Sequence, residues 1–233
     1  MKGIMVSKQI TTPLLICVDF DRTLSNESLI DETMERICSG AGLDVDAIRI
    51  AKQGVESRGD SFSTLDHLRQ HYSPGVLEIV IRQFASIGQK TSVLYEDALP
   101  LLRTLRTRSV PHLILTQGPH EWQELKIMAS KLDDFPYKII AEKDKGKEII
   151  SWQSADGLYQ VPIAGFAPAR RIILIDDKVK SFTSLPSDCS GYLIRRPDEQ
   201  ILPSQSGTVP VNVAIIATLL EVVDKLSMYP VEQ

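Results

Sequence analysis

Two pairs of acidic residues follow apolar runs in this chain of 233 residues. Asp19 and Asp21 end the segment LLICVDFD, and Asp176 and Asp177 end the segment RIILIDD. Side chains two positions apart on a strand point to the same face. Two carboxylates held close together strongly disfavour double ionisation unless a cation or a proton lies between them. Because Mg²⁺ prefers oxygen ligands and keeps several waters for substrate phosphate, these four residues predict a magnesium site.

One further apolar run ends in groups that could bind phosphate, and another leads to such a group. The run HLILTQ ends in Thr116 and Gln117 before a predicted helix, where a hydroxyl and free backbone N–H groups form a phosphate cradle. Lys145 stands at the start of the next predicted helix, where its ammonium could neutralise phosphate charge. Lys143 and Lys147 flank it and remain alternatives. The whole set suits phosphoryl transfer to a carboxylate nucleophile.

Five apolar runs predict the strands that must position these groups, at 14–20, 112–117, 137–142, 171–177 and 191–196. They are near-continuous rather than alternating, which indicates strands buried on both faces of a parallel sheet. Helical patterns separate them from the second run on, at 97–108, 119–132, 145–152 and 211–226. We therefore expect a doubly wound, mainly parallel, Rossmann-like α/β sheet. Its carboxyl strand ends, where ligands bind in such sheets, gather the candidate residues.

The interval 25–92 breaks this alternation of strands and helices. It contains four helical patterns punctuated by glycines and no strong strand pattern. We predict an all-helical domain at 25–92, inserted into a core formed by 1–24 and 93–233. The Gly- and Pro-punctuated stretch 154–169 predicts a loop or a short hairpin.

Composition limits the classes of function. The net charge of −4 gives no reason to expect a nucleic-acid partner. No window approaches the roughly 18 apolar residues of a membrane span, so no membrane association is expected. The three cysteines are widely spaced and show no metal-type pairing, which indicates reduced thiols in a cytoplasmic protein. The oligomeric state stays open.

The four motifs occur in an order that resembles the haloacid dehalogenase (HAD) superfamily, specifically its phosphatase branch. DFDRT resembles the DxDxT signature of that superfamily, and LILTQG resembles the second motif. DKGKEI resembles the third motif and ILIDD the acidic fourth motif. The helical interval after Leu24 resembles the cap that the family places after its first motif. A lone DxDxT would be a weak signal, but the ordered set is specific.

The resemblance implies a Mg²⁺-dependent phosphatase acting on a small phosphorylated metabolite. Asp19 would attack phosphorus to form an aspartyl-phosphate, and Asp21 would serve as general acid and base. Asp19, the main-chain carbonyl of Asp21 and Asp176 would hold Mg²⁺, with Asp177 as a further ligand or neighbour. The substrate phosphate would be bound by the second and third motifs, through Thr116, Gln117 and Lys145.

A narrower, distant likeness links DFDRTLSNESLIDE to the opening of phosphoserine phosphatases. Aligning the IDE triplets puts the cap glutamate of those enzymes at Ser28, one position from Glu27. The second and fourth motifs also depart from theirs, so the likeness supports the cap type and not the substrate. Two alternatives remain: a phosphotransferase or phosphomutase that uses the same intermediate, and a non-catalytic protein that binds a phosphoryl ligand.

Overall fold

The computed structural model describes residues 11–87, 92–197 and 206–226. Its sheet has six strands in the order β3-β2-β1-β4-β5-β6, and every neighbouring pair is parallel. The strands are β1 (Leu15–Val18), β2 (His112–Gln117), β3 (Tyr137–Ile140), β4 (Ile172–Asp176), β5 (Ser190–Ile194) and β6 (Val213–Ile216). The order winds outward in both directions from β1, as in doubly wound sheets. The predicted α/β fold is confirmed.

The register of the central strands brings their carboxyl ends level. Val18 of β1 lies beside Ile114 of β2 and Ile175 of β4. Asp19 therefore leaves the sheet at the height of Asp176, although the two residues are far apart in the sequence. The two acidic pairs meet at one edge because the strands before them are in register.

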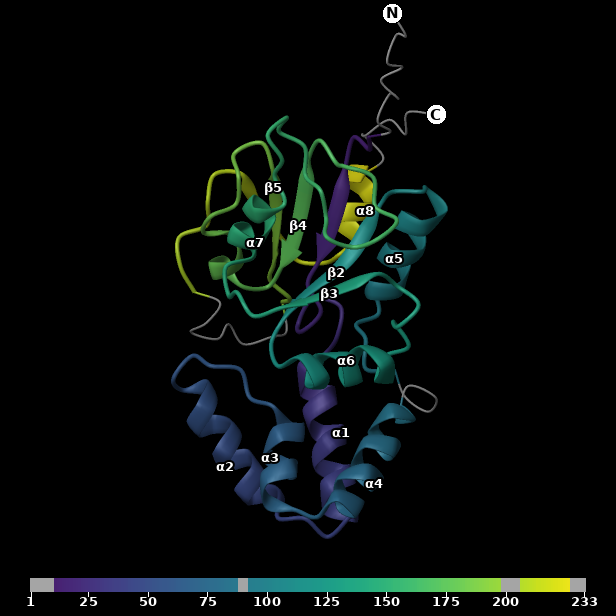
Figure 1. The fold of residues 1–233 in the computed structure, drawn as a ribbon, viewed down its shortest axis with the longest axis vertical. Helices are drawn as coiled ribbons and strands as arrows, with labels where there is room; N and C mark the ends of the chain where they lie inside the picture. Colours follow the sequence, from purple (N-terminus) through teal and green to yellow (C-terminus); the bar gives the residue numbers. More distant parts are fainter. Residues whose placement is uncertain (1–10, 88–91, 198–205, 227–233) are drawn as a thin grey trace, which may run out of the picture.

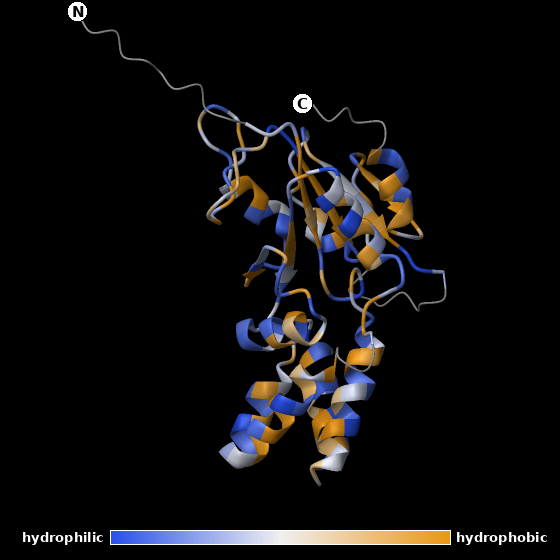
Figure 2. Cartoon of the chain, turned by 90° about the vertical axis from the view of Figure 1, so that its right-hand side faces the viewer, coloured by the Kyte–Doolittle hydropathy of each residue, from blue (hydrophilic) through white to orange (hydrophobic). Residues whose placement is uncertain are grey.

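Alternate side chains of β1 enter different apolar clusters on the two faces of the sheet. Ile16 and Val18 pack with α5 (Ala98–Thr107), α6 (His120–Ala129) and α8 (Leu220–Leu226). Leu15 and Cys17 pack with α7 (Lys145–Ser151), the short 3-10 helix η2 (Val179–Phe182) and the stretch 159–169. Figure 2 shows the strands as the most continuously hydrophobic part of the molecule. Burial on both faces explains the unbroken apolar runs.

Four helices form what we call the helical segment: α1 (Glu27–Gly40), α2 (Val45–Glu56), α3 (Thr64–His71) and α4 (Pro74–Ala85). Three of them begin at side chains that accept from a backbone N–H of the first turn, namely Asn26, Asp44 and Ser63. The fourth has Pro at its start, where the missing N–H costs nothing. Figure 1 shows this segment beyond the carboxyl ends of the strands.

The apolar cluster of the helical segment is continuous with that of the sheet. Helix α6 lies between them, and the rings of Phe84 from α4 and Trp122 from α6 are 5.4 Å apart between centroids. One cluster includes Val18, Trp122, Leu68 and Phe84. The helical segment therefore covers apolar surface of α6 as well as its own.

The predicted helix at 211–226 is wrong in its first part. Val213–Ile216 is the edge strand β6, paired with β5, and the helix α8 begins only at Leu220. The stretch Val-Ala-Ile-Ile favours a strand once β5 offers an unpaired edge. The predicted loop at 154–169 holds neither helix nor strand, and has isolated bridges at Tyr159 and Ala169. Residues 88–91, at the end of the predicted insertion, lie outside the described residues.

Within the described ranges, no helix has both the length and the apolar character to span a membrane.

Asp97, at the start of α5, joins several segments of the chain. Its carboxylate accepts two hydrogen bonds of 3.0 Å from Arg196, which follows β5. It also accepts from the Thr218 hydroxyl at 2.7 Å and from the Leu219 N–H at 2.9 Å, before α8. Arg196 donates in turn to the carbonyl of Thr23 at 2.8 Å. This ion pair therefore holds the two chain segments that enter and leave the helical segment.

We expect Asp97→Asn to lower the free energy of unfolding at pH 7 by about 3 kcal/mol, because Arg196 would stay largely buried without its counter-charge. Burial alone would raise the pKa of Asp97, but the hydrogen bonds from Arg196 and Thr218 hold it below its ordinary value. A carboxylate with a lowered folded-state pKa stabilises the protein fully above the unfolded value, about 3.9, and this contribution is lost as pH falls through the folded value. The difference between wild type and variant should therefore shrink below about pH 4.

Urea unfolding of wild type and variant at pH 7 and pH 3 measures this difference. Asp46→Asn is the matched control, since it removes an exposed Asp–Arg pair with Arg49 whose loss should cost below about 1 kcal/mol. Equal losses for Asp97→Asn and Asp46→Asn would contradict the prediction.

Candidate active site

The four predicted acidic residues all lie buried at the carboxyl edge of the sheet. Carboxylate oxygens of Asp19, Asp176 and Asp177 lie within 4.8 Å of one another. The Thr23 hydroxyl donates to Asp19 Oδ2 at 3.3 Å, and the Lys178 N–H donates to Asp176 Oδ1 at 2.7 Å. These bonds fix the directions in which the carboxylates point. A donor set made only of oxygen fits a hard divalent cation.

Lys145 lies between two of these carboxylates. Its ammonium donates to Asp19 Oδ1 and, at 2.6 Å, to Asp176 Oδ2. Burial raises the pKa of Asp19 to about 6, although Lys145 lowers it, and the nearby Asp176 adds to the rise. Burial alone would lower the pKa of Lys145, but Asp176 and Asp19 raise it above its ordinary value. Lys145 therefore stays charged and holds the two carboxylates together.

The start of α7 places Lys145 at this position. Asp144 caps the helix by accepting from the Gly146 N–H at 3.0 Å, and it also accepts from the Ser184 N–H at 3.3 Å. A Cβ on Gly146 would collide with the backbone of Ser184 and Leu185. Glycine in the motif DKGKEI therefore lets α7 approach the segment after η2 closely. This approach directs the lysine into the site.

The flanking lysines lie elsewhere. Lys143 donates to the Gly59 carbonyl at 2.6 Å and to Asp60 at 3.0 Å, both in the loop after α2. Lys147 is exposed. Of the three lysines that the sequence offered, Lys145 is the one in contact with the acidic residues.

The two candidate residues of the second motif make contacts in different places, one beside the site and one with the helical segment. Thr116 is fully buried at the end of β2, and its hydroxyl donates to Gln123 Oε1 at 3.3 Å. The side-chain oxygen of Gln117 accepts from the Ser61 hydroxyl at 3.3 Å, in the loop between α2 and α3. Gln117 therefore links the sheet to the helical segment, and its role in phosphate binding stays a prediction.

Two residues of α6 that the sequence analysis missed hold Asp21. Lys126 donates to both carboxylate oxygens of Asp21 at 2.6 Å, and Gln123 Nε2 donates to Asp21 Oδ2 at 2.8 Å. Burial alone would raise the pKa of Asp21, but Lys126 and Gln123 bring it below its ordinary value. Asp21 is thus held as a carboxylate. Gln123 and Lys126 are three apart and share a helix face, which was the available sequence signal.

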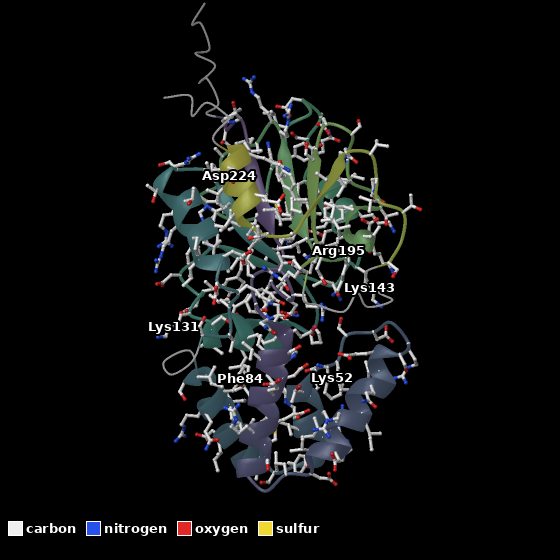
Figure 3. The ribbon with its side chains drawn as sticks, turned by 180° about the vertical axis from the view of Figure 1, so that it is seen from behind. Lys52, Phe84, Lys131, Lys143, Arg195 and Asp224 are labelled. Carbon is white, nitrogen blue, oxygen red and sulfur yellow. The ribbon has the colours of Figure 1, made fainter. Side chains whose placement is uncertain are left out.

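We expect Lys126→Met to lower the free energy of unfolding by about 3 kcal/mol or more, since it leaves the buried Asp21 carboxylate without its counter-charge. Lys126→Arg should restore part of this loss because it keeps the charge. Chemical denaturation at neutral pH measures both. The control is Lys131→Met, which removes an exposed lysine just after the same helix (Figure 3) and should change stability by less than about 0.5 kcal/mol. A Lys126→Met loss as small as that of the control would contradict the ion pair.

Comparisons with known proteins place this geometry in a known fold. No family model and no curated protein matches the sequence. A protein described as a haloacid dehalogenase-like hydrolase from Burkholderia xenovorans LB400 has a similar structure, with a TM-score of 0.63 at 18% identity, covering 91% of this chain and 98% of that one. A HAD phosphatase from Thermococcus onnurineus gives a TM-score of 0.52 at 19% identity, covering 92% and 97%. The magnesium-bound HAD-hydrolase YfnB from Bacillus subtilis gives 0.52 at 12%, covering 93% and 100%.

At identities this low the comparisons show a shared architecture, which extends over nearly the whole of each chain. The order and spacing of the four motifs led to the same fold from the sequence alone. The chain therefore has the fold of the haloacid dehalogenase-like hydrolases.

Proposed function

We propose that this protein is a Mg²⁺-dependent phosphatase that hydrolyses a small phosphomonoester through an aspartyl-phosphate on Asp19. The observation that carries the proposal is the buried triad of Asp19, Lys145 and Asp176, in which one ammonium contacts both carboxylates. Carboxylates too far apart to share one ion would have favoured a protein that kept the pocket and lost catalysis. Their proximity favours the enzyme over the binding protein.

The donor set fits the metal that the fold family implies. Asp19, Asp176 and Asp177 would hold Mg²⁺ through carboxylate oxygens, with the main-chain carbonyl of Asp21 as a further ligand. When bound, the cation would neutralise charge on the transferring phosphoryl group. The magnesium in the YfnB structure supports this choice of metal. The charges of Mg²⁺ and of a phosphate dianion cancel, so binding both leaves the net charge of the site unchanged.

In the first half-reaction, a carboxylate oxygen of Asp19 attacks phosphorus and the bond from phosphorus to the ester oxygen breaks. Lys145 keeps that carboxylate in place and ionised, and with Thr116 it contacts the phosphoryl oxygens. The departing alkoxide takes a proton from Asp21. Because Lys126 holds Asp21 as a carboxylate, this step requires Asp21 to be protonated first. An aryl leaving group, which departs as a stable phenolate, avoids that requirement.

In the second half-reaction, water attacks phosphorus of the aspartyl-phosphate, and the bond to the Asp19 oxygen breaks. Asp21 accepts the proton of the water as general base, and its lowered pKa keeps it ionised for this step. The products are inorganic phosphate and the original Asp19 carboxylate. The ion pair with Lys126 therefore keeps Asp21 ready to accept this proton, which it can give to the departing alkoxide of the next turnover.

We also propose that the segment 25–92 is a cap that closes over this site. Its loop between α2 and α3 contacts the sheet portion at Gln117 and Lys143, and Arg69 of α3 pairs with Glu121 of α6 at 2.5 Å. These contacts are exposed and polar, so they cost little to break. Opening would admit substrate, and closing would exclude bulk water.

We expect Asp19→Asn to reduce hydrolysis of p-nitrophenyl phosphate by about a thousandfold or more, since the amide is similar in shape but not nucleophilic. Release of nitrophenolate in the presence of Mg²⁺, measured by absorbance, tests this. Asp156→Asn, at an exposed position in the 154–169 loop, is the matched control and should keep wild-type activity. Appreciable activity in Asp19→Asn would assign the nucleophile to another residue. Turnover that rises with an added alcohol acceptor would favour the phosphotransferase.

We expect Mg²⁺ to raise the melting temperature of the wild type in a concentration-dependent way, because a ligand that binds only the folded state stabilises it. Asp176→Asn should abolish this increase, although its starting melting temperature also changes because Lys145 loses a partner. Differential scanning fluorimetry with Mg²⁺ and with EDTA gives the shift, and Asp156→Asn again serves as control. An unchanged Mg²⁺ shift in Asp176→Asn would remove that residue from the metal site.

A further inference from the structure

Arg22, which stands between Asp21 and Thr23 in the first motif, has a backbone conformation that is unfavourable for an arginine. Its φ of 59° lies in the left-handed region, which costs free energy for any residue that carries a Cβ. Among the described residues, the other two non-glycine residues with positive φ are Ser109 and Lys131. These two stand just after the ends of α5 and α6, where helices often terminate in this conformation. Arg22 ends no helix, so its conformation has a different cause.

The turn after Asp21 holds Arg22 in this conformation. The Arg22 N–H donates to the Ser25 carbonyl at 2.9 Å, and the N–H groups of Leu24 and Ser25 both donate to the Phe20 carbonyl at 2.9 Å. Glycine could adopt the same φ at a lower cost. Strained residues cluster at functional sites, where the surrounding structure keeps them in place. The strain therefore directs attention to what the arginine side chain does in the candidate active site.

The side chain of Arg22 pairs with the second acidic residue of the fourth motif. Its Nε lies 3.5 Å from Asp177 Oδ2, and the exposed fractions of the two side chains are 12% and 2%. Arg195, which follows β5, donates from Nη1 to the main-chain carbonyl of Asp177. Figure 3 shows Arg195 at the end of the sheet that faces the helical segment. Two guanidinium groups therefore lie beside Asp177, one at its carboxylate and one at its main chain.

Each of the four buried carboxylates of the site has a cationic side chain beside it. These pairs are Lys145 with Asp19 and Asp176, Lys126 with Asp21, and Arg22 with Asp177. Lys178 adds a fourth cation, since burial alone would lower its pKa but Asp177 and Asp19 help to raise it above its ordinary value. Among these groups the positive charges are as many as the negative ones. Binding of a divalent cation alone would therefore leave the site with excess positive charge, which is costly to bury.

We propose that Arg22 is a positioning residue that sets the metal affinity of the site. Its charge beside Asp177 keeps Mg²⁺ binding weak on its own and makes tight binding depend on a phosphoryl dianion. This inference rests on the phosphatase function proposed above. At ~8 Å in water, one unit charge already weakens the binding of a divalent ion by about fivefold. Arg22 lies closer than that to Asp177 and is mostly buried, where water and salt screen the repulsion less.

Calorimetric titration of Mg²⁺ into EDTA-treated, dialysed protein tests the proposal without turnover. In the wild type, saturating inorganic phosphate should tighten Mg²⁺ binding by about tenfold or more, within the usual range for coupled sites. The reverse titration should show that Mg²⁺ tightens phosphate binding by the same factor, because coupling is reciprocal. Equal affinities with and without the other ligand would overturn the inference alone. No binding of Mg²⁺ or of phosphate in any titration would overturn the proposed site, and the inference with it.

Variants at position 22 isolate the effect of the charge. Without phosphate, Arg22→Asn and Arg22→Gln should each bind Mg²⁺ at least about fivefold more tightly than the wild type, because both remove the charge. Asparagine tolerates the left-handed backbone, and glutamine keeps a hydrogen-bond donor for Asp177, so either variant can serve if the other fails to fold. Arg22→Lys keeps the charge and should keep the wild-type affinity. A purely structural role would lower stability without tightening Mg²⁺ binding.

Arg103→Asn is the matched control, since it removes an exposed arginine of α5 and should leave the Mg²⁺ affinity unchanged. Wild-type affinity in Arg22→Asn and Arg22→Gln would overturn the role of Arg22. A gain of the same size in Arg22→Lys would also overturn it, because the gain would then come from altered packing rather than from the lost charge. If neither neutral variant folds, the wild-type titrations with and without phosphate decide.

Discussion

The bridge from Lys145 to Asp19 and Asp176 is the constraint on which the rest of the site depends. It joins the ends of β1 and β4 to the start of α7, and the carboxylates are almost wholly buried. Buried ions of one sign are stable only when opposite charges are held close to them. The capping of α7 by Asp144 and the close approach at Gly146 therefore matter as much to the site as the carboxylates do, because they keep the ammonium where repulsion would otherwise separate Asp19 from Asp176.

Most of the sheet and the core of the site could be predicted because both depend on local sequence. Unbroken apolar runs locate β1 to β5, and the residues that end them locate the site. The edge strand β6 was missed because four residues with an apolar pattern also fit a helix, and only the free edge of β5 decides between them. Lys126 was missed for a related reason. An isolated lysine on a helix is usually solvated, and only the tertiary packing of α6 beside the sheet brings it to Asp21.

Helix α6 contacts both the helical segment and the candidate active site. One face of α6 supplies Gln123 and Lys126 to Asp21, while Trp122 packs against Phe84 of α4. Because the same apolar cluster continues from the sheet into α1 and α4, removing the segment would expose apolar surface on α6. A movement of the proposed cap is thus constrained on the α4 side, where the packing is apolar, and less constrained on the α2 side, where an exposed ion pair and an exposed hydrogen bond join it to the sheet portion.

This asymmetry separates the tightly held part of the molecule from the part that can move. The residues proposed to act on phosphate lie on the sheet and on α6 and α7, where burial and paired charges leave few alternative positions. Helix α2, by contrast, has Ile48 as its buried residue and is joined to α1 by partly exposed ion pairs. Such pairs contribute little to stability, so α2 can move at a smaller cost than α4, whose Phe84 packs against Trp122.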